Sequence, residues 1–199
     1  MITIIDYQLN NLRSLENTFR RLGHDTRVTS SRDDVAAADR LVLPGVGAFG
    51  QAMENLRKLD LDEVIVQKGQ AGTPLLGVCL GFHLLFTESE EFGQHTGLGL
   101  LDGRVERLPG GVHVPHMGWN QLHMERRDPL VANVADGSFV YFVHSYRAIP
   151  SDPEVVIATT DYGVDFASVV GDDNIRATQF HPEKSQHVGE QILDNFARL

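Results

Sequence analysis

The sequence predicts an α/β protein with an open, mostly parallel central sheet that carries helices on both faces. Short apolar segments typical of buried strands alternate with segments whose apolar residues recur at helical spacing. Glycine and proline mark the turns between these segments. The chain has 199 residues, which suits one domain with a sizeable core, and it contains no linker, repeat or low-complexity stretch. We therefore expect a single domain over residues 1–199.

The alternation is clearest in the amino-terminal half. Residues 1–6 predict a first strand. A helix follows it, because four apolar residues recur at helical spacing, and Gly23 marks the turn to an extended segment over 25–29. The four residues are Leu12, Leu15, Phe19 and Leu22. Beyond them we expect strands over 41–43 and 75–78, helices over 48–59 and 61–70, and a helix-like segment over 80–87.

The carboxy-terminal half is rich in strand patterns. We expect strands over residues 101–108, 121–124, 139–146, 155–160, 167–170 and 175–180. A last helix begins at about Ser185 and places Val188, Ile192, Phe196 and Leu199 on one face. Asp172 and Asp173 indicate a turn between two of these strands.

The composition argues against several classes of function. A formal net charge of −10 disfavours nucleic acid or an anionic membrane surface as the main partner. One cysteine rules out an internal disulfide and fits a reducing cytoplasm. The longest stretch without Asp, Glu, Lys or Arg, residues 69–87, contains Gly, Pro, Gln and His, which indicates buried core instead of a membrane span. The amino terminus lacks the basic start of a signal peptide, so we expect a cytoplasmic protein.

The single cysteine, Cys79, lies in the segment Gly-Val-Cys-Leu-Gly at 77–81, between a strand pattern and a helix-like pattern. Such a strand-to-helix turn is typical of a nucleophile elbow, where glycines allow the tight turn and the thiol is exposed to a substrate. The sulfur then lies at a helix amino terminus, which favours the thiolate. A buried free cysteine is the alternative, and the pentapeptide alone does not decide between them.

A second segment, residues 179–184, favours a catalytic role. His181 and Glu183 are two residues apart, so in extended backbone their side chains leave from one face, and Pro182 stiffens the pair. A cysteine nucleophile needs an imidazole to move protons and a carboxylate to orient that imidazole. A turn with a solvated acid is the alternative for the tripeptide alone. The position after a strand pattern favours a triad of Cys79, His181 and Glu183.

The third segment is a glycine-rich turn at residues 43–50, which follows a strand pattern and precedes a helix pattern. Its N–H groups, together with the N–H of Leu80, would form an oxyanion hole. The competing interpretations are a phosphate cradle and a plain turn. The glycine spacing matches neither G-x-x-x-x-G-K-S/T nor G-x-G-x-x-G, so a nucleotide-binding loop is disfavoured. Because Pro44, Cys79 and His181 each follow a strand pattern, we expect them to converge at the carboxyl ends of the strands.

Together these segments resemble the class I (triad) glutamine amidotransferases, and more narrowly the glutaminase subunits of imidazole glycerol phosphate synthase. Pro-Gly-Val-Gly at residues 44–47 distinguishes this narrower group, because other class I glutaminases more often have two adjacent glycines after the proline. The narrower resemblance also includes residues 4–7, 11–14, 116–120, 141–146 and 179–186, so it spans nearly the whole chain. It implies a flavodoxin-like sheet and the class I glutamine amidotransferase fold.

The resemblance also implies a role for each matching residue. Cys79 would be the nucleophile, His181 the general base and acid, and Glu183 its orienting carboxylate. The other assignments are an oxyanion hole from Val46, Gly47 and Leu80, a glutamine site from Gly45, His83, Ser145 and Tyr146, and a partner surface from Asn11, Trp119 and Tyr141. The implied partner is a (β/α)8-barrel cyclase subunit in a heterodimer, which receives ammonia. No cofactor or metal is implied.

Two positions depart from the family pattern. His83 stands four residues after the nucleophile, where the family usually has glutamine. It can still donate a hydrogen bond to substrate, but its reach differs and its charge depends on pH. Residues 8–10 replace a glycine-rich stretch, and Asn10 is a plausible substitute for glycine because asparagine tolerates positive φ.

The remaining polar residues favour structural roles. The spacing of His113, His116 and His123 matches no zinc motif, and His144 is expected to be a packed strand histidine. Two other functions stay open on the residues alone. One is another class I glutaminase subunit, such as that of a pyridoxal phosphate synthase, which Pro-Gly-Val-Gly and residues 116–119 disfavour. The other is a non-catalytic scaffold, for which His83 is the only hint.

Overall fold

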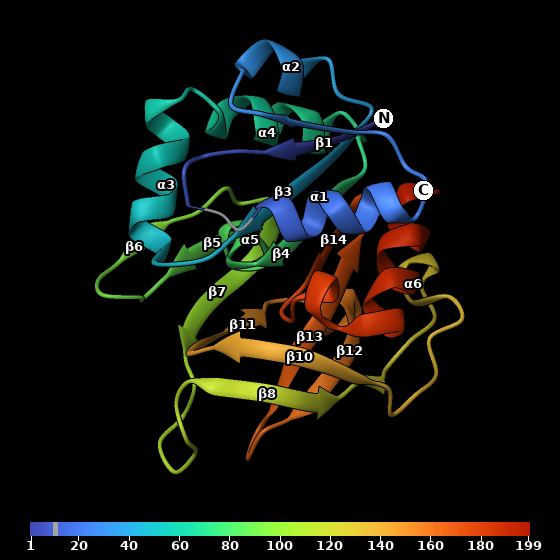
Figure 1. Ribbon diagram of the computed structural model, residues 1–199. Helices are drawn as coiled ribbons and strands as arrows, with labels where there is room; N and C mark the ends of the chain where they lie inside the picture. Colours follow the sequence, from blue (N-terminus) through green and yellow to red (C-terminus); the bar gives the residue numbers. More distant parts are fainter. Residues whose placement is uncertain (10–11) are drawn as a thin grey trace.

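A large mixed sheet forms the centre of the molecule in the computed structural model, which describes residues 1–9 and 12–199 (Figure 1). Its strand order is β2-β1-β3-β4-β14-β13-β12-β9. The parallel part consists of β2 (Thr26–Thr29), β1 (Ile2–Ile5), β3 (Arg40–Gly45), β4 (Leu75–Cys79) and β14 (Ile175–Thr178). The antiparallel part consists of β13 (Asp165–Asp172), β12 (Val156–Asp161) and β9 (His123–Met124). The predicted open, mostly parallel sheet is confirmed.

Helices cover both faces of this sheet, as predicted (Figure 1). Successive strand residues alternate between the faces, so Ile5 and Leu43 belong to one core and Ile4 and Val42 to the other. The first core contains side chains of α2 (Arg32–Ala36), α3 (Phe49–Lys58) and α4 (Asp62–Gln70). The second contains side chains of α1 (Leu12–Arg21) and α6 (Gln186–Ala197). Both cores bury mainly aliphatic and phenylalanine side chains, the residues that gain most from leaving water.

Two smaller sheets lie beside the central one. A four-stranded sheet has the order β11-β7-β5-β6, and β10 pairs with β8 in antiparallel fashion. Their bounds are β11 (Tyr146–Pro150), β7 (Leu101–Arg107), β5 (Phe86–Ser89), β6 (His95–Thr96), β10 (Phe139–His144) and β8 (His116–Gln121). The remaining elements are a short helix, α5 (Leu80–Leu84), and the 3-10 turns η1 (Pro129–Val131), η2 (Pro153–Val155) and η3 (Pro182–Lys184).

Several predicted boundaries were wrong. The helix expected over 80–87 ends at Leu84, and Phe86–Ser89 form β5, because pairing with β7 there overrides the helical pattern. The strand expected over 121–124 is instead β8 followed by the short β9. The strand expected over 139–146 is divided at Ser145, because β10 pairs with β8 whereas β11 pairs with β7. Ser31 begins the unpredicted helix α2, and its hydroxyl accepts a hydrogen bond from the Asp34 N–H.

The carboxyl ends of β3, β4 and β14 lie at one edge of the central sheet. The parallel register places Gly45 opposite Cys79 and Thr178 opposite Val78. The segments that follow these strands therefore start side by side, where open α/β sheets bind their ligands. None of the described helices is long and apolar enough to span a membrane.

The approach of α5 to β3 depends on Gly81. A Cβ at this position would lie 1.7 Å from the Leu43 carbonyl oxygen, which is backbone and cannot rotate away. We expect Gly81→Ala to lower the free energy of unfolding by about 3 kcal/mol, or to prevent folding, because overpacked cores must shift their backbone. Denaturant titration followed by circular dichroism measures the difference. Gly110→Ala is the matched control, since a Cβ there meets no atom within 4 Å, and equal stability of the two variants would contradict the prediction.

Candidate active site

Cys79 ends β4 and immediately precedes α5, in the strand-turn-helix arrangement that the sequence predicts. Its backbone has φ 54° and ψ −106°, a conformation that non-glycine residues rarely adopt. Such strain persists only where the surrounding structure imposes it, and it is typical of functional sites. The thiol lies 3.9 Å from the Val143 carbonyl oxygen, at the surface of a pocket. The turn therefore holds the sulfur at the surface of the pocket.

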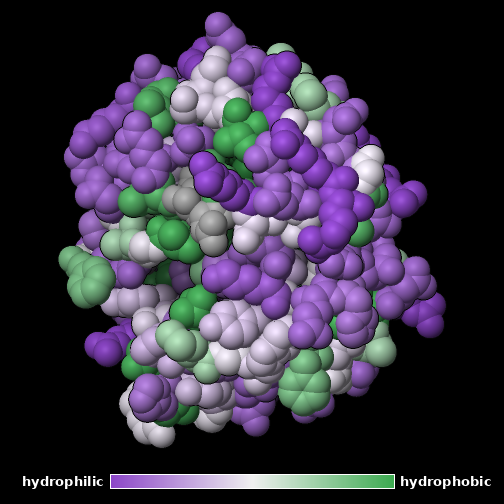
Figure 2. All heavy atoms as spheres, in the orientation of Figure 1, coloured by the Kyte–Doolittle hydropathy of each residue, from purple (hydrophilic) through white to green (hydrophobic). Residues whose placement is uncertain are grey.

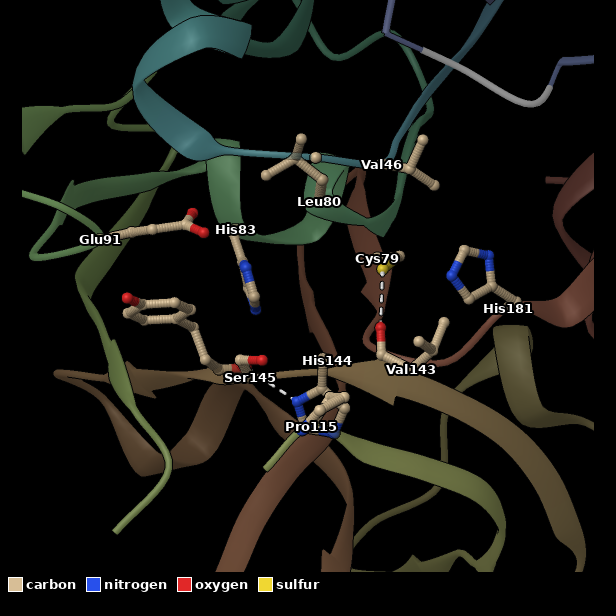
Figure 3. A pocket seen from close by; sticks show the side chains of 12 residues that line it. Val46, Cys79, Leu80, His83, Glu91, Pro115, Val143, His144, Ser145 and His181 are labelled. Atoms are coloured by element: carbon tan, nitrogen blue, oxygen red, sulfur yellow. Dashed lines mark hydrogen bonds between the residues drawn. The ribbon is translucent and has the colours of Figure 1, made fainter. Parts of the chain in front are cut away.

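His181 and Glu183 form a buried hydrogen-bonded pair. The Nδ1–H group of His181 donates to Oε1 of Glu183 over 2.8 Å, and both side chains are nearly inaccessible to water. The expected extended backbone is wrong here, because Pro182 begins the 3-10 turn η3. The tighter turn nevertheless joins the two side chains. Nε2 of His181 has no hydrogen-bond partner among the described residues, and Figure 3 shows the ring beside Cys79.

The charge state of His181 depends on its neighbours. Burial alone would lower its pKa, but the negative charge of Cys79 and the interactions with Glu183 outweigh burial. Together they raise the pKa of His181 to about 10. Beside a Cys79 thiolate, the imidazole is therefore protonated at neutral pH.

Backbone hydrogen bonds join the His181 segment to β10. The His181 N–H donates to the Tyr141 carbonyl oxygen over 3.0 Å. Ser185 completes the connection, because its hydroxyl donates to the His181 carbonyl and accepts from the Tyr141 N–H. The position of the imidazole is thus coupled to the backbone of β10.

The glycine-rich loop lies between β3 and α3. The Tyr7 hydroxyl donates to the Pro44 carbonyl over 2.7 Å, and a Cβ on Gly45 would lie 2.0 Å from that hydroxyl oxygen. Only glycine therefore fits at position 45. Gly47 has φ +106°, a conformation that also favours glycine. The Val46 N–H donates to the Leu9 carbonyl over 3.1 Å, so it is already engaged and is not free to stabilise an oxyanion.

A pocket of about 290 Å³ brings most of the predicted site residues together (Figure 3). The pocket is lined by Val46, Gly47, Cys79, Leu80, His83, Glu91, Pro115, Val143, His144, Ser145, Tyr146 and His181. Gly45, which the resemblance assigns to the glutamine site, does not line this pocket and instead lines a smaller cavity that also touches His181. Cys79 and His181 lie at one side of the main pocket and Glu91 lies at the other. The volume is near the lower limit for sites that bind small molecules.

His83 is buried and neutral. Its Nε2 lies 2.7 Å from Oε1 of Gln179, so Nε2 carries the proton when it donates to this amide oxygen. Burial lowers the pKa of His83 to about 4, and the hydrogen bond with Gln179 only partly opposes it. The positive charge that the sequence allowed at this position is therefore absent near pH 7. His83 contributes neutral polar atoms to the pocket wall.

The sequence analysis missed Glu91, the acidic residue of the pocket. Its Oε2 accepts a hydrogen bond from the Phe49 N–H over 2.8 Å. Burial raises the pKa of Glu91, although the hydrogen bond with Phe49 and the charge of His95 act in the opposite direction. Glu88 and Glu90 lie close by in the chain, so no local pattern distinguishes the one carboxylate that reaches the pocket.

His144 is a packed strand histidine, as predicted, and it also lines the pocket. Its Nδ1–H donates to the Tyr146 carbonyl over 2.8 Å, and its Nε2 accepts from Nδ1–H of His116 over 2.9 Å. Burial lowers the pKa of His144 to about 3 and that of His116 to about 4, so both are neutral. Among the described residues, no group of His, Cys, Asp and Glu could hold a metal ion. Asp173 lies in the turn between β13 and β14, as predicted, whereas Asp172 is the last residue of β13.

Trp119 and Tyr141, two of the three predicted partner residues, lie on the outer two-stranded sheet. Trp119 on β8 pairs with Tyr141 on β10, their ring centroids are 6.0 Å apart, and Lys184 lies 5.9 Å from the centre of the Tyr141 ring. Trp119 is 45% exposed, with exposed Met117 and Phe139 on the same sheet. Apolar side chains appear among hydrophilic ones over this lower part of the molecule in Figure 2. Asn11 and Asn10 lie outside the described residues.

Comparison with known proteins identifies the family. The sequence pattern described as "Glutamine amidotransferase class-I" matches residues 3–199. The chain belongs to the class I glutamine amidotransferase family. It is 52% identical over its full length to "Imidazole glycerol phosphate synthase subunit HisH" of Syntrophotalea carbinolica, and covers all of that protein. It is 50% identical to the subunit HisH of Aquifex aeolicus, where 98% of this chain and 95% of the relative are covered. The narrower resemblance is therefore confirmed.

Solved structures agree on the fold. One described as "Crystal structure of glutamine amidotransferase" matches with a TM-score of 0.79 at 19% identity and covers 100% of both chains. The "Structure of PurLQS from Thermotoga maritima" matches with the same TM-score of 0.79 at 17% identity, over 99% of this chain and 97% of that chain. The predicted class I glutamine amidotransferase fold is confirmed.

The influence of Cys79 on His181 leads to a prediction. In Cys79→Ala the thiolate charge is absent, so we expect the pKa of His181 to fall by about 1 to 3 pH units, the usual effect of one nearby charge. Histidine NMR titration of both proteins measures it. His83 is the internal reference, because burial and Gln179 set its pKa. An unchanged pKa of His181 would show that Glu183, and not the thiolate, raises the pKa of the ring.

Proposed function

We propose that this chain is the glutaminase subunit of a cytoplasmic imidazole glycerol phosphate synthase. It hydrolyses glutamine to glutamate and ammonia, and residues 1–199 act as one glutamine amidotransferase domain. The placement of Cys79 and His181 on one pocket, with Glu183 hydrogen-bonded to His181 behind it, is the observation that carries the proposal. Identity near 50% to HisH subunits over the whole chain supports the assignment to histidine biosynthesis. It also disfavours a pyridoxal phosphate synthase subunit.

Cys79 begins the reaction as the nucleophile. Its thiolate attacks the side-chain amide carbon of glutamine, and the carbonyl oxygen gains a negative charge. The protonated His181 then donates its proton to the nitrogen, because ammonia and not amide ion must leave. A thioester of glutamate with Cys79 remains.

His181 changes its role when the thioester forms. The negative charge of Cys79 is the largest of the influences that raise the His181 pKa, and it disappears once the sulfur is acylated. Burial then lowers the pKa relative to the free enzyme. The neutral imidazole, oriented by Glu183, takes a proton from water, which attacks the thioester and releases glutamate. One side chain thus acts first as acid and then as base.

The negative oxygen of each tetrahedral intermediate needs hydrogen-bond donors. Leu80 offers the backbone N–H next to the nucleophile, and the loop at Val46 and Gly47 would offer another. Because the Val46 N–H donates to Leu9 in this structure, the loop must rearrange before it can contribute. Leu9 adjoins the segment that contains Asn11. We infer that binding of the partner there promotes the rearrangement.

The far end of the pocket would hold the α-substituents of glutamine. The Glu91 carboxylate suits the α-ammonium group, because opposite charges attract strongly where water is excluded. The Ser145 and Tyr146 backbone would hold the α-carboxylate. His83, between these groups and Cys79, would offer a neutral ring to the substrate. Gly45 leaves room for the Tyr7 hydroxyl, which holds the start of the loop beside this pocket.

The ammonia is proposed to pass to a cyclase subunit of (β/α)8-barrel fold in a heterodimer. Ammonia released into neutral water would become ammonium, which has no lone pair for attack. The two active sites must therefore be joined by a sealed route. The exposed Trp119 and the half-buried Tyr141 beside it, with Asn11, would form the surface that contacts the cyclase. The cyclase would convert its phosphoribosyl-carboxamide substrate to imidazole glycerol phosphate and an aminoimidazole carboxamide ribonucleotide.

The function is tested by glutamate release from the purified chain, alone and with the cyclase subunit and its ribonucleotide ligand. Strong activation only in the full mixture would support a glutaminase controlled by its partner. High activity of the chain alone would point to an independent glutaminase, and no activity in either mixture would contradict the proposal.

Cys79→Ala should abolish the reaction and leave the complex intact. Loss of the nucleophile removes the thioester route, so we expect glutamate release to fall by at least about 10⁴-fold. Isothermal titration with the cyclase should give an unchanged Kd, because the side chain is buried in the pocket. Turnover at the wild-type rate would remove Cys79 from the mechanism.

Trp119→Ala should weaken the complex with the cyclase. A central aromatic side chain at an interface commonly contributes about 2 kcal/mol, which corresponds to roughly thirtyfold in Kd. Isothermal titration measures it, with Phe92→Ala as the control, since Phe92 is even more exposed but lies outside the β8–β10 sheet. Equal Kd values for both variants and the wild type would place the interface elsewhere.

A further inference from the structure

The oxyanion loop, residues 44–48, is fixed at both ends. At its start, β3 pairs with β4 and the Tyr7 hydroxyl donates to the Pro44 carbonyl. At its end, α3 begins at Phe49, and the N-cap residue Ala48 has no side chain that can accept a hydrogen bond. The first turn of α3 also lacks an acidic residue. The amino terminus of this helix therefore needs an acceptor from elsewhere in the chain.

Glu91 supplies that acceptor. Its Oε2 accepts the Phe49 N–H over 2.8 Å from a position 42 residues further along the chain. The carboxylate is buried, and its charge lies at the positive end of the helix dipole. A carboxylate at this position fixes the residue that directly follows the oxyanion loop.

The same carboxylate lines the pocket that we assign to glutamine. A carboxylate offers two oxygens and about four lone pairs, so it can accept from Phe49 and from a bound ammonium group together. An ammonium group on Oε1 would orient the carboxylate and hold Oε2 against the helix. Occupation of the pocket and the position of the loop then depend on one side chain.

We infer that Glu91 is a positioning residue for the oxyanion hole in addition to a ligand for the substrate. It caps α3, sets the carboxy-terminal end of the loop 44–48, and couples the geometry of that loop to the presence of the α-ammonium group. This inference rests on the proposed glutaminase function. It predicts that loss of the cap slows acylation of Cys79 even by a reagent that has no ammonium group.

The test compares Glu91→Ala with Glu91→Gln in the complex with the cyclase subunit and its ribonucleotide. Glutamine at position 91 keeps an oxygen that can accept from Phe49, whereas alanine does not. Each variant reacts with p-nitrophenyl acetate and, separately, with iodoacetamide. In the first reaction the thiolate attacks the ester carbonyl, p-nitrophenolate leaves and an oxyanion forms on the way. In the second, sulfur displaces iodide and no oxyanion forms.

We expect p-nitrophenyl acetate to acylate Cys79 at least about tenfold more slowly in Glu91→Ala than in the wild type. This fall in rate is smaller than the loss of about 10²-fold that follows removal of an oxyanion donor. Glu91→Gln should remain within about twofold of the wild type, and alkylation by iodoacetamide should be unchanged in both variants. Cys79→Ala gives the background of reaction at other groups.

Two results would overturn the inference. One is acylation of Glu91→Ala at the wild-type rate, and the other is an equal fall in acylation and alkylation, which would indicate a general structural change. Failure of the proposed function is distinguishable, because it would appear as a wild-type complex that releases no glutamate from glutamine while p-nitrophenyl acetate still acylates Cys79.

Discussion

The parallel pairing of β3 with β4 is the constraint on which the site depends. It places Gly45 opposite Cys79, so the loop and the nucleophile start from adjacent positions in the sheet. The distance between α5 and β3 is small because α5 packs directly on the Leu43 carbonyl, and only a glycine at position 81 permits this contact. Hydrogen bonds then orient the groups around this pair, from Tyr7 to the loop and from β10 to the His181 segment. The core therefore positions the thiol and the imidazole before any substrate binds, whereas the loop at Val46 must still rearrange.

The proton chemistry follows from burial and one variable charge. His181 lies where burial opposes its protonation, and the charge of the neighbouring sulfur favours protonation. In the proposed mechanism, acylation of Cys79 removes that charge and hydrolysis of the thioester restores it. Glu183 maintains the orientation throughout, because its hydrogen bond with Nδ1 leaves Nε2 toward the reacting atoms. In the proposed mechanism, His181 therefore changes from acid to base without moving.

Local patterns predicted the parts of the site that are local in the chain. The strand, turn and glycines around Cys79 and the short spacing of His181 and Glu183 are visible in the sequence. Features that depend on distant pairing were not predicted. The helix after Cys79 ends early because Phe86 joins β5, and the strand expected over 139–146 divides at Ser145 because its halves have different partners.

The same limit applies to the pocket. Glu91 reaches Phe49 across 42 residues, and the Val46 N–H meets the Leu9 carbonyl across the sheet edge. Both contacts arise from the packing of elements that the sequence pattern could locate only one at a time. The resemblance to the family supplied the roles of Ser145 and Tyr146, which no local motif would have indicated.

Tyr141 holds the His181 segment through its backbone, whereas its ring faces Trp119 on the proposed partner surface. Backbone hydrogen bonds survive most changes of side chain. A different side chain at position 141 would therefore alter the proposed partner surface and leave these backbone hydrogen bonds to the His181 segment in place.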